Sequence, residues 1–500
     1  MLPRLPSRTQ TAVFYTVSLA FLYLRSFRLS GTPMLATGDQ MLFFTRAQRV
    51  LQGQVIYRDF FEMVTPGTEW LHAAVLAITG IHSWVPPLLT VTLGMLYCVL
   101  MTHLSRIVLP GYARFLPALV FLALVANNAL DLTHHWYSAL LALSAIAVLA
   151  PEVTPVRVAS ASVLCGMATM FTQTQGLGAF LGLCLFVGMY SRKLLAVLLM
   201  PYLLVVASGL GVCALGAGSR VVFYHLVLFP LRYMSSGDMN SPRAYLRQIP
   251  PLHHAGDIPH LLPVLFVYLT VPYAYVLAGL SLRRSRNEIA PAQRNLLLLL
   301  IAIGVGLFLG VATAPRLYRL STVAAPGVIL LLWWMSRWPR LRFALVTMAV
   351  AFFVVSPLRR QVQKMPILTM PTGRAAFTDP NLFLEYQWLA QRTRPDNSFF
   401  NEPGLQFYLA LHNPTASEFV NYGEFTRPEQ VDAVLHDLQR DPPQYIVLSL
   451  SDRGLGLPGD SGGPFRDFMH THYEETARFF MGESTQYSEA IWQMSPKPKN

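Results

Sequence analysis

The sequence predicts a polytopic α-helical membrane protein with about eleven spans and a C-terminal soluble α/β domain. Of its 500 residues, 53% are hydrophobic and only 13% are charged, whereas soluble domains are about 25% charged. Residues 1–360 hold 27 basic and 9 acidic side chains, whereas residues 361–500 hold 11 and 17. Long apolar runs recur before residue 360. Together these observations exclude a soluble cytosolic enzyme and a disordered chain.

Eleven apolar runs are candidates for spanning helices, because a helix satisfies its own backbone polar groups within the bilayer. They cover residues 11–29, 85–107, 114–131, 136–151, 157–172, 176–190, 194–216, 261–281, 295–313, 321–336 and 342–356. No small-residue cleavage site follows the first run, so we interpret it as an uncleaved helix.

The short loops predict the orientation, because loops rich in Lys and Arg stay on the cytoplasmic side. With the N-terminus inside, the arginine-rich loops are cytoplasmic, and seven of the nine acids before residue 360 fall outside. We therefore expect a bacterial inner-membrane protein with a transmembrane domain over 1–360. Its long loops 30–84 and 217–260 and an α/β domain over 361–500 are expected to share the outer side.

The C-terminal domain shows both strand and helix patterns. Apolar β-prone runs predict strands at Ser398–Phe400 and Tyr445–Leu450, each after a turn signal. Helical spacing covers 379–394 and 428–440. The second of these helices is expected to open with a capping box of Thr426 and Glu429.

The first outer loop has the most informative pattern. After Gly38-Asp39-Gln40 comes an amphipathic segment, 41–53, and after Pro66-Gly67 a second apolar segment runs to Gly80. Both are too short to span comfortably, so we expect helices that lie in the membrane interface. Between them the chain reads Tyr57-Arg58-Asp59-Phe60-Phe61-Glu62.

This layout resembles the membrane glycosyltransferases of the GT-C class, including the protein O-mannosyltransferase and lipid A aminoarabinose transferase branches. The matching positions are an acid soon after the first span, an R-x-x-x-x-G-x-x-x-Y-x-D-F segment and a Pro-Gly: Asp39; Arg49, Gly53, Tyr57, Asp59 and Phe60; Pro66 and Gly67. The resemblance implies an inverting transfer of a sugar from a polyprenyl-phosphate donor to a hydroxyl of a lipid, glycan or protein on the outer face.

Two positions depart from this pattern. Gln40 stands where some branches carry a second acid, and Thr65 stands where the aminoarabinose branch has Lys before the Pro. The sugar and the acceptor are therefore not carried over from either branch.

Asp39 is our candidate for the catalytic base, because transfer requires the acceptor hydroxyl to lose its proton as it attacks the anomeric carbon. A helix cap or a solvated loop acid is the structural alternative. Asp59 and Glu62 are candidate supporting acids, and the alternative is that they pair with the arginines of their own loop.

A divalent cation held by Asp39, Asp59 and Glu62 is an open alternative, because hard cations take carboxylate oxygens. Nothing in the spacing requires it, so the sequence predicts no certain cofactor and no metal site.

Arg316 and Arg319 lie in a short outer loop, where the positive-inside rule does not place them. Arginine binds phosphate in a bidentate manner, so we expect these two to bind the donor phosphate. The alternative is that they reach lipid headgroups. The middle outer loop also offers arginines and tyrosines suited to sugar and phosphate: Arg220, Arg232, Arg243, Arg247, Tyr224, Tyr233 and Tyr245.

Tyr57, His134 and His135 are candidate sugar or acceptor contacts. The next residues, Trp136 and Tyr137, are expected to be interfacial anchors. A second group could bind metal, although a loop role is favoured: His253, His254, Asp257 and His260.

Residues 459–464 read Gly-Asp-Ser-Gly-Gly-Pro, which resembles the nucleophile motif of chymotrypsin-like proteases, with Ser461 in the nucleophile position. Residues 361–500 contain no cysteine and mix helix with strand patterns, so we interpret this segment as a turn.

Two other function classes fit the sequence less well. A transporter or flippase of lipid-linked sugars would place ionisable residues or broken helices near the bilayer midplane, whereas these spans are almost free of acids. The net charge of +12 would suggest nucleic-acid binding in a soluble protein. Here the basic residues lie mostly in loops between apolar runs, so no nucleic-acid partner is expected.

Overall fold

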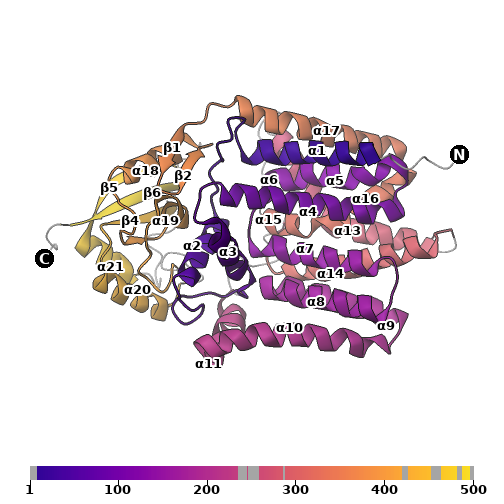
Figure 1. The fold of residues 1–500 in the computed structure, drawn as a ribbon, viewed down its shortest axis with the longest axis horizontal. Coiled ribbons are helices and arrows are strands. Elements are labelled where there is room, and N and C mark those ends of the chain that lie inside the picture. Colours follow the sequence, from indigo (N-terminus) through magenta and orange to yellow (C-terminus); the bar gives the residue numbers. More distant parts are fainter. Residues whose placement is uncertain are drawn as a thin grey trace.

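The computed structural model describes residues 8–234, 245, 258–284, 288–418, 426–451, 463–480 and 487–495. A bundle of roughly parallel and antiparallel helices forms one part, and a smaller region with two sheets covers one end of it (Figure 1).

Each predicted apolar run coincides with a helical segment of the bundle. These segments are α1 (Arg8–Ser26), α4 (Val85–Val108), the series η1 (Gly111–Phe115), α5 (Leu116–Phe121), η2 (Leu122–Ala126) and α6 (Asn127–Ala129), then α7 (His134–Leu149), α8 (Pro155–Phe171), α9 (Gln173–Tyr190), α10 (Leu194–Ala217), α13 (Ile258–Arg284), α14 (Pro291–Val311), α16 (Ala324–Trp334) with η7 (Met335–Arg337), and α17 (Pro339–Val362).

Among the described residues, six helices are long and apolar enough to cross a membrane. They are Val85–Val108, Gly111–Ala129, Leu194–Ala217, Leu261–Arg284, Pro291–Val311 and Pro339–Val362, while α7 and α8 are shorter apolar helices. The protein is therefore an integral membrane protein of the polytopic helical type, and the number eleven stays a prediction.

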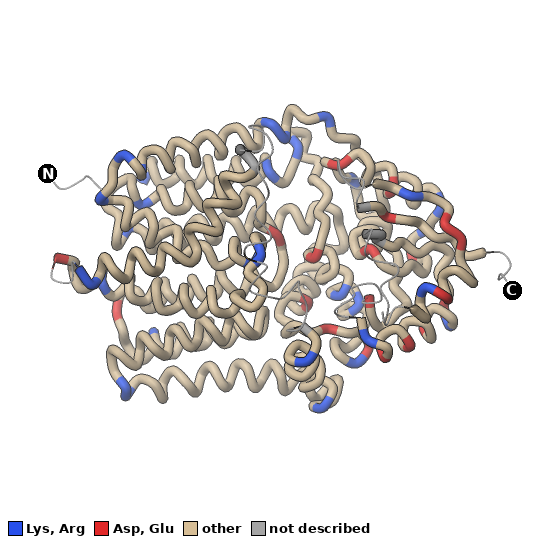
Figure 2. The backbone as a smooth tube through the Cα atoms, turned by 180° about the vertical axis from the view of Figure 1, so that it is seen from behind, with Lys and Arg blue, Asp and Glu red and all other residues tan. Residues whose placement is uncertain are grey.

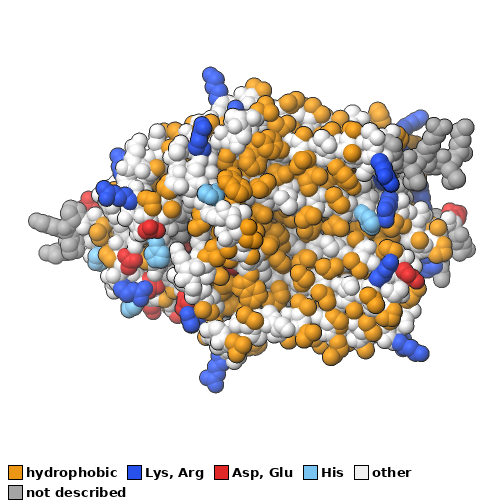
Figure 3. All heavy atoms as spheres, in the orientation of Figure 1, with side chains coloured by type: hydrophobic (Ala, Val, Ile, Leu, Met, Phe, Trp, Pro, Cys, Tyr) orange, Lys and Arg blue, Asp and Glu red, His pale blue; other side chains and the backbone are white. Residues whose placement is uncertain are grey.

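The distribution of side chains fits a bilayer around the bundle. A broad band of hydrophobic side chains covers the helices between two charged ends (Figure 3). Basic residues gather at the end that carries the N-terminus, whereas most acids lie at the opposite end, in and near the C-terminal region (Figure 2). The charge asymmetry of the sequence thus corresponds to the two ends of one helical bundle.

Glycines bring α9 and α14 into close contact inside the bundle. A Cβ at Gly178 would lie 2.1 Å from the carbonyl oxygen of Gly306, and one at Gly182 would lie 2.3 Å from that of Ala302. Small residues allow membrane helices to approach backbone to backbone, so larger side chains at these positions would separate the two helices.

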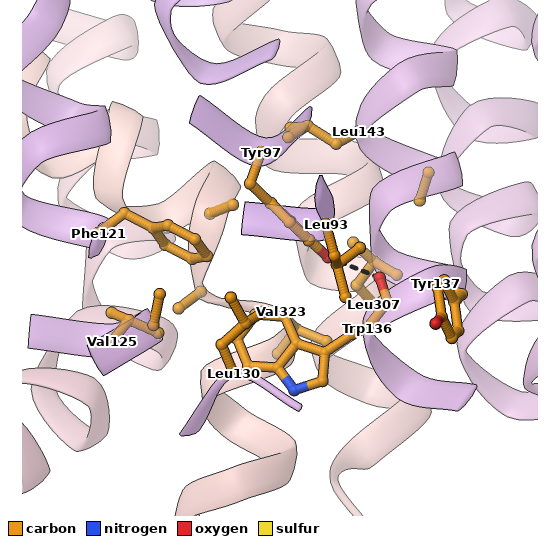
Figure 4. Packing of buried hydrophobic residues seen from close by; sticks show 14 of the residues in the cluster. Leu93, Tyr97, Phe121, Val125, Leu130, Trp136, Tyr137, Leu143, Leu307 and Val323 are labelled. Atoms are coloured by element: carbon orange, nitrogen blue, oxygen red, sulfur yellow. Dashed lines mark hydrogen bonds between the residues drawn. The ribbon is translucent and has the colours of Figure 1, made fainter. Parts of the chain in front are cut away.

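The aromatic residues at the start of α7 belong to the interior, which contradicts their predicted role as interfacial anchors. Trp136 is 1% exposed and Tyr137 is 8% exposed. The indole Nε1 of Trp136 donates to the carbonyl of Ala129 at 3.1 Å, and the carbonyl of Trp136 accepts from Tyr97 Oη at 2.7 Å (Figure 4). Because α7 packs against α4, α8, α9 and α14, its aromatic side chains face neighbouring helices rather than lipid.

Short helices lie between the bundle and the C-terminal region, and both predicted interfacial helices are present. They are α2 (Asp39–Leu51) and α3 (Gly67–Thr79), which cross the end of the bundle (Figure 1). The other short segments near this end are α11 (Ser219–Phe223), η3 (Tyr224–Leu228), η4 (Pro230–Met234) and α15 (Leu317–Thr322).

The C-terminal region contains two sheets. Strands β1 (Ile367–Met370) and β2 (Gly373–Ala376) form an antiparallel pair. A second sheet has the order β3-β4-β6-β5, from Phe399–Phe400, Tyr445–Ser451, Tyr487–Met494 and Tyr473–Phe480; β3 and β4 are parallel and the other pairs are antiparallel. Its helices are α18 (Pro380–Ala390), α19 (Pro403–Leu409), α20 (Pro428–Arg440) and α21 (Gly463–His472).

The predicted strands and helices of this region are therefore present, with two corrections. Helix α18 ends at Ala390, before the predicted boundary. The cap of α20 lies one residue later than predicted: the backbone N–H of Arg427 donates to Gln430 Oε1 at 3.0 Å. Pro428 explains the shift, because proline is favoured at the first helical position, where its missing N–H costs nothing.

Candidate active site

Asp39 is the first residue of α2 and lies at the junction of the bundle and the C-terminal region. The preceding Gly38 has φ 76° and ψ −161°, a conformation essentially restricted to glycine, and no side chain caps the helix. Asp39 is exposed. Within the described part of the chain, no ion pair or hydrogen bond engages its carboxylate. It is therefore neither a helix cap nor half of a salt bridge.

The surroundings of Asp39 combine low polarity with positive charge. Burial by the protein around it raises the pKa of its carboxyl, while Arg319, Arg316 and Arg46 lower it. The side chain is nevertheless exposed to solvent while protein surrounds part of it, and we call this partly enclosed position of Asp39 the recess. A carboxylate in such a place binds a proton more tightly than one in water does.

The two arginines come from the segment that follows α14. Arg316 precedes α15 and Arg319 lies within it, and both are partly buried. Each lies close enough to Asp39 to act on it electrostatically. The structure thus brings together the predicted base and the two predicted phosphate ligands, which are 277 or more residues apart in the sequence.

The histidine pair lies on the same side. The rings of His134 and His135 are 4.0 Å apart between centroids, and Phe43 of α2 packs against His134 at 5.2 Å. Arg319 lies within electrostatic reach of both histidines. Five predicted site residues therefore gather around one point: Asp39, His134, His135, Arg316 and Arg319.

Asp131 belongs to this group, although the sequence indicated only that it lies on the outer side. The pKa of Asp131 is raised to about 6, mainly by burial and to a smaller extent by the charge of Asp39, while the hydrogen bonds from Thr133 act in the opposite direction. Its Oδ1 accepts from the backbone N–H and the hydroxyl of Thr133, at 3.0 and 2.7 Å. The next backbone N–H, of Leu132, donates to Gln40 Oε1 at 3.3 Å. In the sequence, Asp131 could have been recognised as a site residue because it lies three residues before the histidine pair.

A second charged cluster lies deeper along α2. It confirms the alternative that Glu62 pairs with an arginine of its own loop, and it adds Glu418, which sequence reasoning did not find. Arg46 is 1% exposed and pairs with Glu62 and, at 3.2 Å, with Glu418 of the C-terminal region. Arg49 lies 3.9 Å from Glu418. Glu62 Oε1 also accepts from the backbone N–H groups of Met63 and Val64, at 2.7 and 2.9 Å.

Glu69 completes this cluster as a neutral acid. It is fully buried, and burial raises its pKa well above the usual range; the charge of Glu62 and a hydrogen bond with it act in the same direction. The two arginines, Arg46 and Arg49, are then balanced by two carboxylates, Glu62 and Glu418, which is what burial of charge requires.

The predicted supporting acids do not face Asp39. Asp59 pairs with the exposed Arg58 at 2.8 Å, and its carboxylate accepts from the backbone N–H of Val55 at 2.7 Å. The hydrogen bond from Arg58 lowers the pKa of Asp59. Among the described residues, no three His, Cys, Asp or Glu side chains form a group able to hold a metal ion, so Asp39, Asp59 and Glu62 are not one ligand set.

Tyr57 is a structural residue of the first outer loop. Its φ is 71°, it is 3% exposed, and its hydroxyl donates to the carbonyl of Val64 at 2.8 Å. Its hydroxyl is thus bonded within its own loop, and its ring packs against His225 of η3 with centroids 5.6 Å apart.

The middle loop contributes contacts to the C-terminal region where it is described. Tyr224 Oη donates to Glu429 at 3.0 Å, and the guanidinium of Arg427 lies 3.9 Å from the ring centre of Tyr233. Other predicted positions lie outside the described residues: Arg243, Arg247, His253, His254, Asp257, Ser461 and the side chain of His260.

An apolar groove of about 630 Å³ lies between α13, α16 and α17. Its lining includes Phe266, Leu269, Trp334, Leu341 and Met348. Tyr268, next to Leu269 in the chain, lies within electrostatic reach of Arg316. The groove itself lies further along the bundle: it is lined by the end of α16, by η7 and by the first half of α17, so it lies toward the arginine-rich loop at residues 337–342 rather than beside Arg316 and Arg319.

Comparison with known proteins supports the fold. No protein-family model and no curated protein matches the sequence. The structure is similar to ArnT from Cupriavidus metallidurans bound to undecaprenyl phosphate, with a TM-score of 0.60 and 14% identity over 97% of this chain and 98% of that one. The apo state of the same protein gives 0.55 and 13% over 96% and 97%.

A third similar structure is the Archaeoglobus fulgidus oligosaccharyltransferase in complex with Zn and sulfate. Its TM-score is 0.45 at 11% identity, over 87% of this chain and 67% of that chain, and no argument rests on it. The likeness to ArnT over almost the full length of both chains confirms the predicted GT-C-like fold.

Proposed function

We propose that this chain is an inverting glycosyltransferase that moves a sugar from a polyprenyl-phosphate donor to an acceptor hydroxyl. One observation carries the proposal: an accessible carboxylate, Asp39, lies within electrostatic reach of Arg316 and Arg319 at one end of an apolar helical bundle. A base and two phosphate-binding cations in one recess are the groups that this reaction needs.

Asp39 acts on the acceptor. Its carboxylate takes the proton of the acceptor hydroxyl as that oxygen forms a bond to the anomeric carbon of the donor sugar. The raised pKa strengthens Asp39 as a base, because a carboxylate that binds a proton more tightly is better able to remove one from the acceptor hydroxyl.

Arg316 and Arg319 act on the leaving group. The bond between the anomeric carbon and the phosphate oxygen breaks, and its electron pair stays on that oxygen, so the polyprenyl phosphate leaves with an additional negative charge. Guanidinium groups stabilise this charge by bidentate hydrogen bonds. Attack from the face opposite the phosphate inverts the anomeric carbon.

The apolar groove suits the lipid part of the donor. Its lining side chains are almost all hydrophobic, so part of a long isoprenoid chain can lie there, deeper in the bundle than the phosphate. The similar ArnT structure contains undecaprenyl phosphate, which supports the same chemical class of donor here.

The proposal extends to the location of the reaction. Helix α2, which begins with Asp39, lies at the end of the bundle away from the N-terminus (Figure 1), and from the positive-inside rule we propose that this end faces the outer side of a bacterial inner membrane. The region over 361–500 would then lie outside and shape the acceptor side. No step is assigned to a metal ion, and assays with and without EDTA measure any need for a divalent cation.

The test uses the full chain in proteoliposomes with a radiolabelled polyprenyl-phosphate sugar and a mixture of envelope acceptors. Wild type is expected to transfer label, and Asp39→Asn to lower the rate by about 10²- to 10⁴-fold, the usual contribution of a general base. The matched control is Asp59→Asn, which changes an acid of the same loop outside the recess. Movement of labelled lipid without transfer would support a transporter and overturn the proposal, as would full activity of Asp39→Asn.

A further inference from the structure

We propose that the C-terminal region holds Asp39 in its working position, with Tyr408 and Glu418 as positioning residues. The inference rests on the proposed role of Asp39 as base, and it deepens that function by assigning to the C-terminal region a part in catalysis. Tyr408 contacts the segment before Asp39, and Glu418 contacts the helix after it.

The first tether holds the segment that leads into α2, residues 33–38. The backbone N–H of Leu35 donates to the carbonyl of Ala376 at 2.9 Å, and the N–H of Ala376 donates to the carbonyl of Pro33 at 2.9 Å. These two hydrogen bonds pair the segment with strand β2, beside which it lies like a short additional strand. The N–H of Ala36, three residues before Asp39, donates to Tyr408 Oη at 2.9 Å.

Tyr408 is rigidly held, so its hydroxyl is a fixed point. It is 0% exposed, and its ring contacts Phe407 and Tyr386 at centroid distances of 5.2 and 6.2 Å. A buried side chain in dense packing has few alternative rotamers. The bond to Ala36 therefore transmits the position of the C-terminal region to the backbone just before Asp39.

The second tether holds α2 beyond Asp39. Arg46 follows Asp39 by seven residues, which is about two helical turns or ~10 Å along the axis, on the same side of the helix. Glu418 pairs with Arg46 at 3.2 Å and lies 3.9 Å from Arg49. Both arginines belong to α2, so the carboxylate of Glu418 attaches this one helix to the C-terminal region.

Packing strengthens this tether. Phe44 of α2 is 0% exposed and contacts Phe407 of α19 with ring centroids 5.5 Å apart. Because Phe407 and Tyr408 are adjacent, α19 touches α2 with one residue and the segment before it with the next. Helix α2 and the segment that leads into it, residues 33–38, are thus both held by α19.

The region between the tethers explains why they matter. Gly38, with its φ of 76°, joins the two held pieces directly before Asp39, and the start of α2 lacks a side-chain cap. Glycine gives the backbone conformational freedom at this point. Without tethers on both sides, the carboxylate would sample many positions relative to Arg316 and Arg319, and catalysis depends on fixed geometry.

The experiment compares Tyr408→Phe with Tyr386→Phe in the full chain, reconstituted in nanodiscs. Tyr408→Phe removes only the oxygen that accepts from Ala36. Tyr386 is a matched control, since it is also buried, at 1% exposure, and its ring packs against Tyr408. Hydrogen exchange of peptides over residues 33–41 measures the tether, and donor kinetics measure its catalytic effect.

We expect Tyr408→Phe to raise exchange at residues 33–38 by about fivefold, the effect of losing one ordinary hydrogen bond. We also expect kcat to fall while the donor KM stays close to wild type, because the arginines that bind the donor are untouched. Tyr386→Phe should change neither quantity. Glu418→Gln should raise exchange over residues 40–49 and lower kcat, whereas Glu429→Gln, on the exposed contact with Tyr224, should not.

The outcomes separate the two proposals. Unchanged exchange in Tyr408→Phe and Glu418→Gln would overturn the tethers, whatever the activity. Raised exchange with wild-type kcat would overturn the positioning role. A wild-type chain that transfers no sugar would overturn the proposed function, while the exchange comparison would still decide whether the C-terminal region holds α2.

Discussion

The two ends of α2 use charge in opposite ways. At its beginning, Asp39 is exposed and has neighbouring cations within electrostatic reach, yet within the described residues it makes no ion pair. Two turns later, Arg46 and Glu62 are 1% and 2% exposed and are paired directly. The first arrangement leaves room for a substrate between opposite charges, and the second leaves none.

This difference helps to separate functional from structural charge. Buried charges require partners of opposite sign, and the cluster of Arg46, Arg49, Glu62 and Glu418 satisfies this when Glu69 is protonated. An unpaired carboxylate in an open, partly desolvated recess is costly unless a ligand uses it, so such groups mark functional sites. The comparison predicts large stability effects in the cluster and large kinetic effects in the recess.

The largest stability effect is expected for Arg46→Met. Removing this guanidinium leaves Glu62 and Glu418 with Arg49 alone, so one buried carboxylate loses its counter-charge, at a cost of about 3–5 kcal/mol. The measurement is thermal unfolding of the purified chain in detergent. Arg58→Met, which removes the exposed partner of Asp59, should leave the unfolding temperature close to that of wild type, because exposed ion pairs contribute little to stability. Equal losses for the two variants would contradict the distinction between the closed cluster and the exposed pair.

Arg319→Gln should change kinetics with little effect on stability. Loss of a charge-assisted contact to the donor phosphate, worth about 1.5–3 kcal/mol, should raise the donor KM by about 10- to 100-fold. The variant should also move the acidic limb of the pH profile of kcat/KM to higher pH. Arg319 lowers the pKa of Asp39, so without it the base becomes protonated at a higher pH. An unchanged KM would indicate that Arg319 binds lipid headgroups instead.

A third group of acids lies in the C-terminal region, and there protonation of the carboxyl groups, rather than pairing with arginine, avoids buried negative charge. In the C-terminal region, burial together with the charge of Glu489 raises the pKa of Glu402 to about 8, and burial raises that of Glu385 well above its usual range. The stabilising contribution of protonated Glu402 is complete below its unfolded pKa of 4.5 and is lost as the pH rises to about 8.

Glu402→Gln should therefore remove this pH dependence. At pH 8.5 the variant should unfold about 2–4 °C above wild type, the shift that ~1 kcal/mol produces in a domain of moderate size. The advantage should shrink as the pH falls toward 5, where wild-type Glu402 is protonated in the folded state. Thermal scans across this range check the prediction, and a difference between the two proteins that is independent of pH would contradict it.

Much of the fold could be predicted because periodicity and composition are local. Apolar runs identified every helical segment of the bundle, and turn signals located β3, β4 and α20. The short interfacial helices were also predictable, since their amphipathic pattern and the flanking glycines lie within a few residues. The interior position of Trp136 was not predictable, because an aromatic residue near a helix start fits either a lipid headgroup layer or a packed interior.

For the site, the sequence by itself determined which residues are chemically suited: an acid after the first helix, two arginines in an outer loop and a histidine pair. It could do so because charges are rare in this chain and each one in a membrane boundary needs a reason. Only the tertiary structure decided that Asp39, Arg316 and Arg319 share a recess and that Glu62 belongs with Arg46 and Glu418. The physical reason is that a salt bridge or a shared recess depends on distances of a few ångströms between segments hundreds of residues apart, and no local pattern encodes those distances.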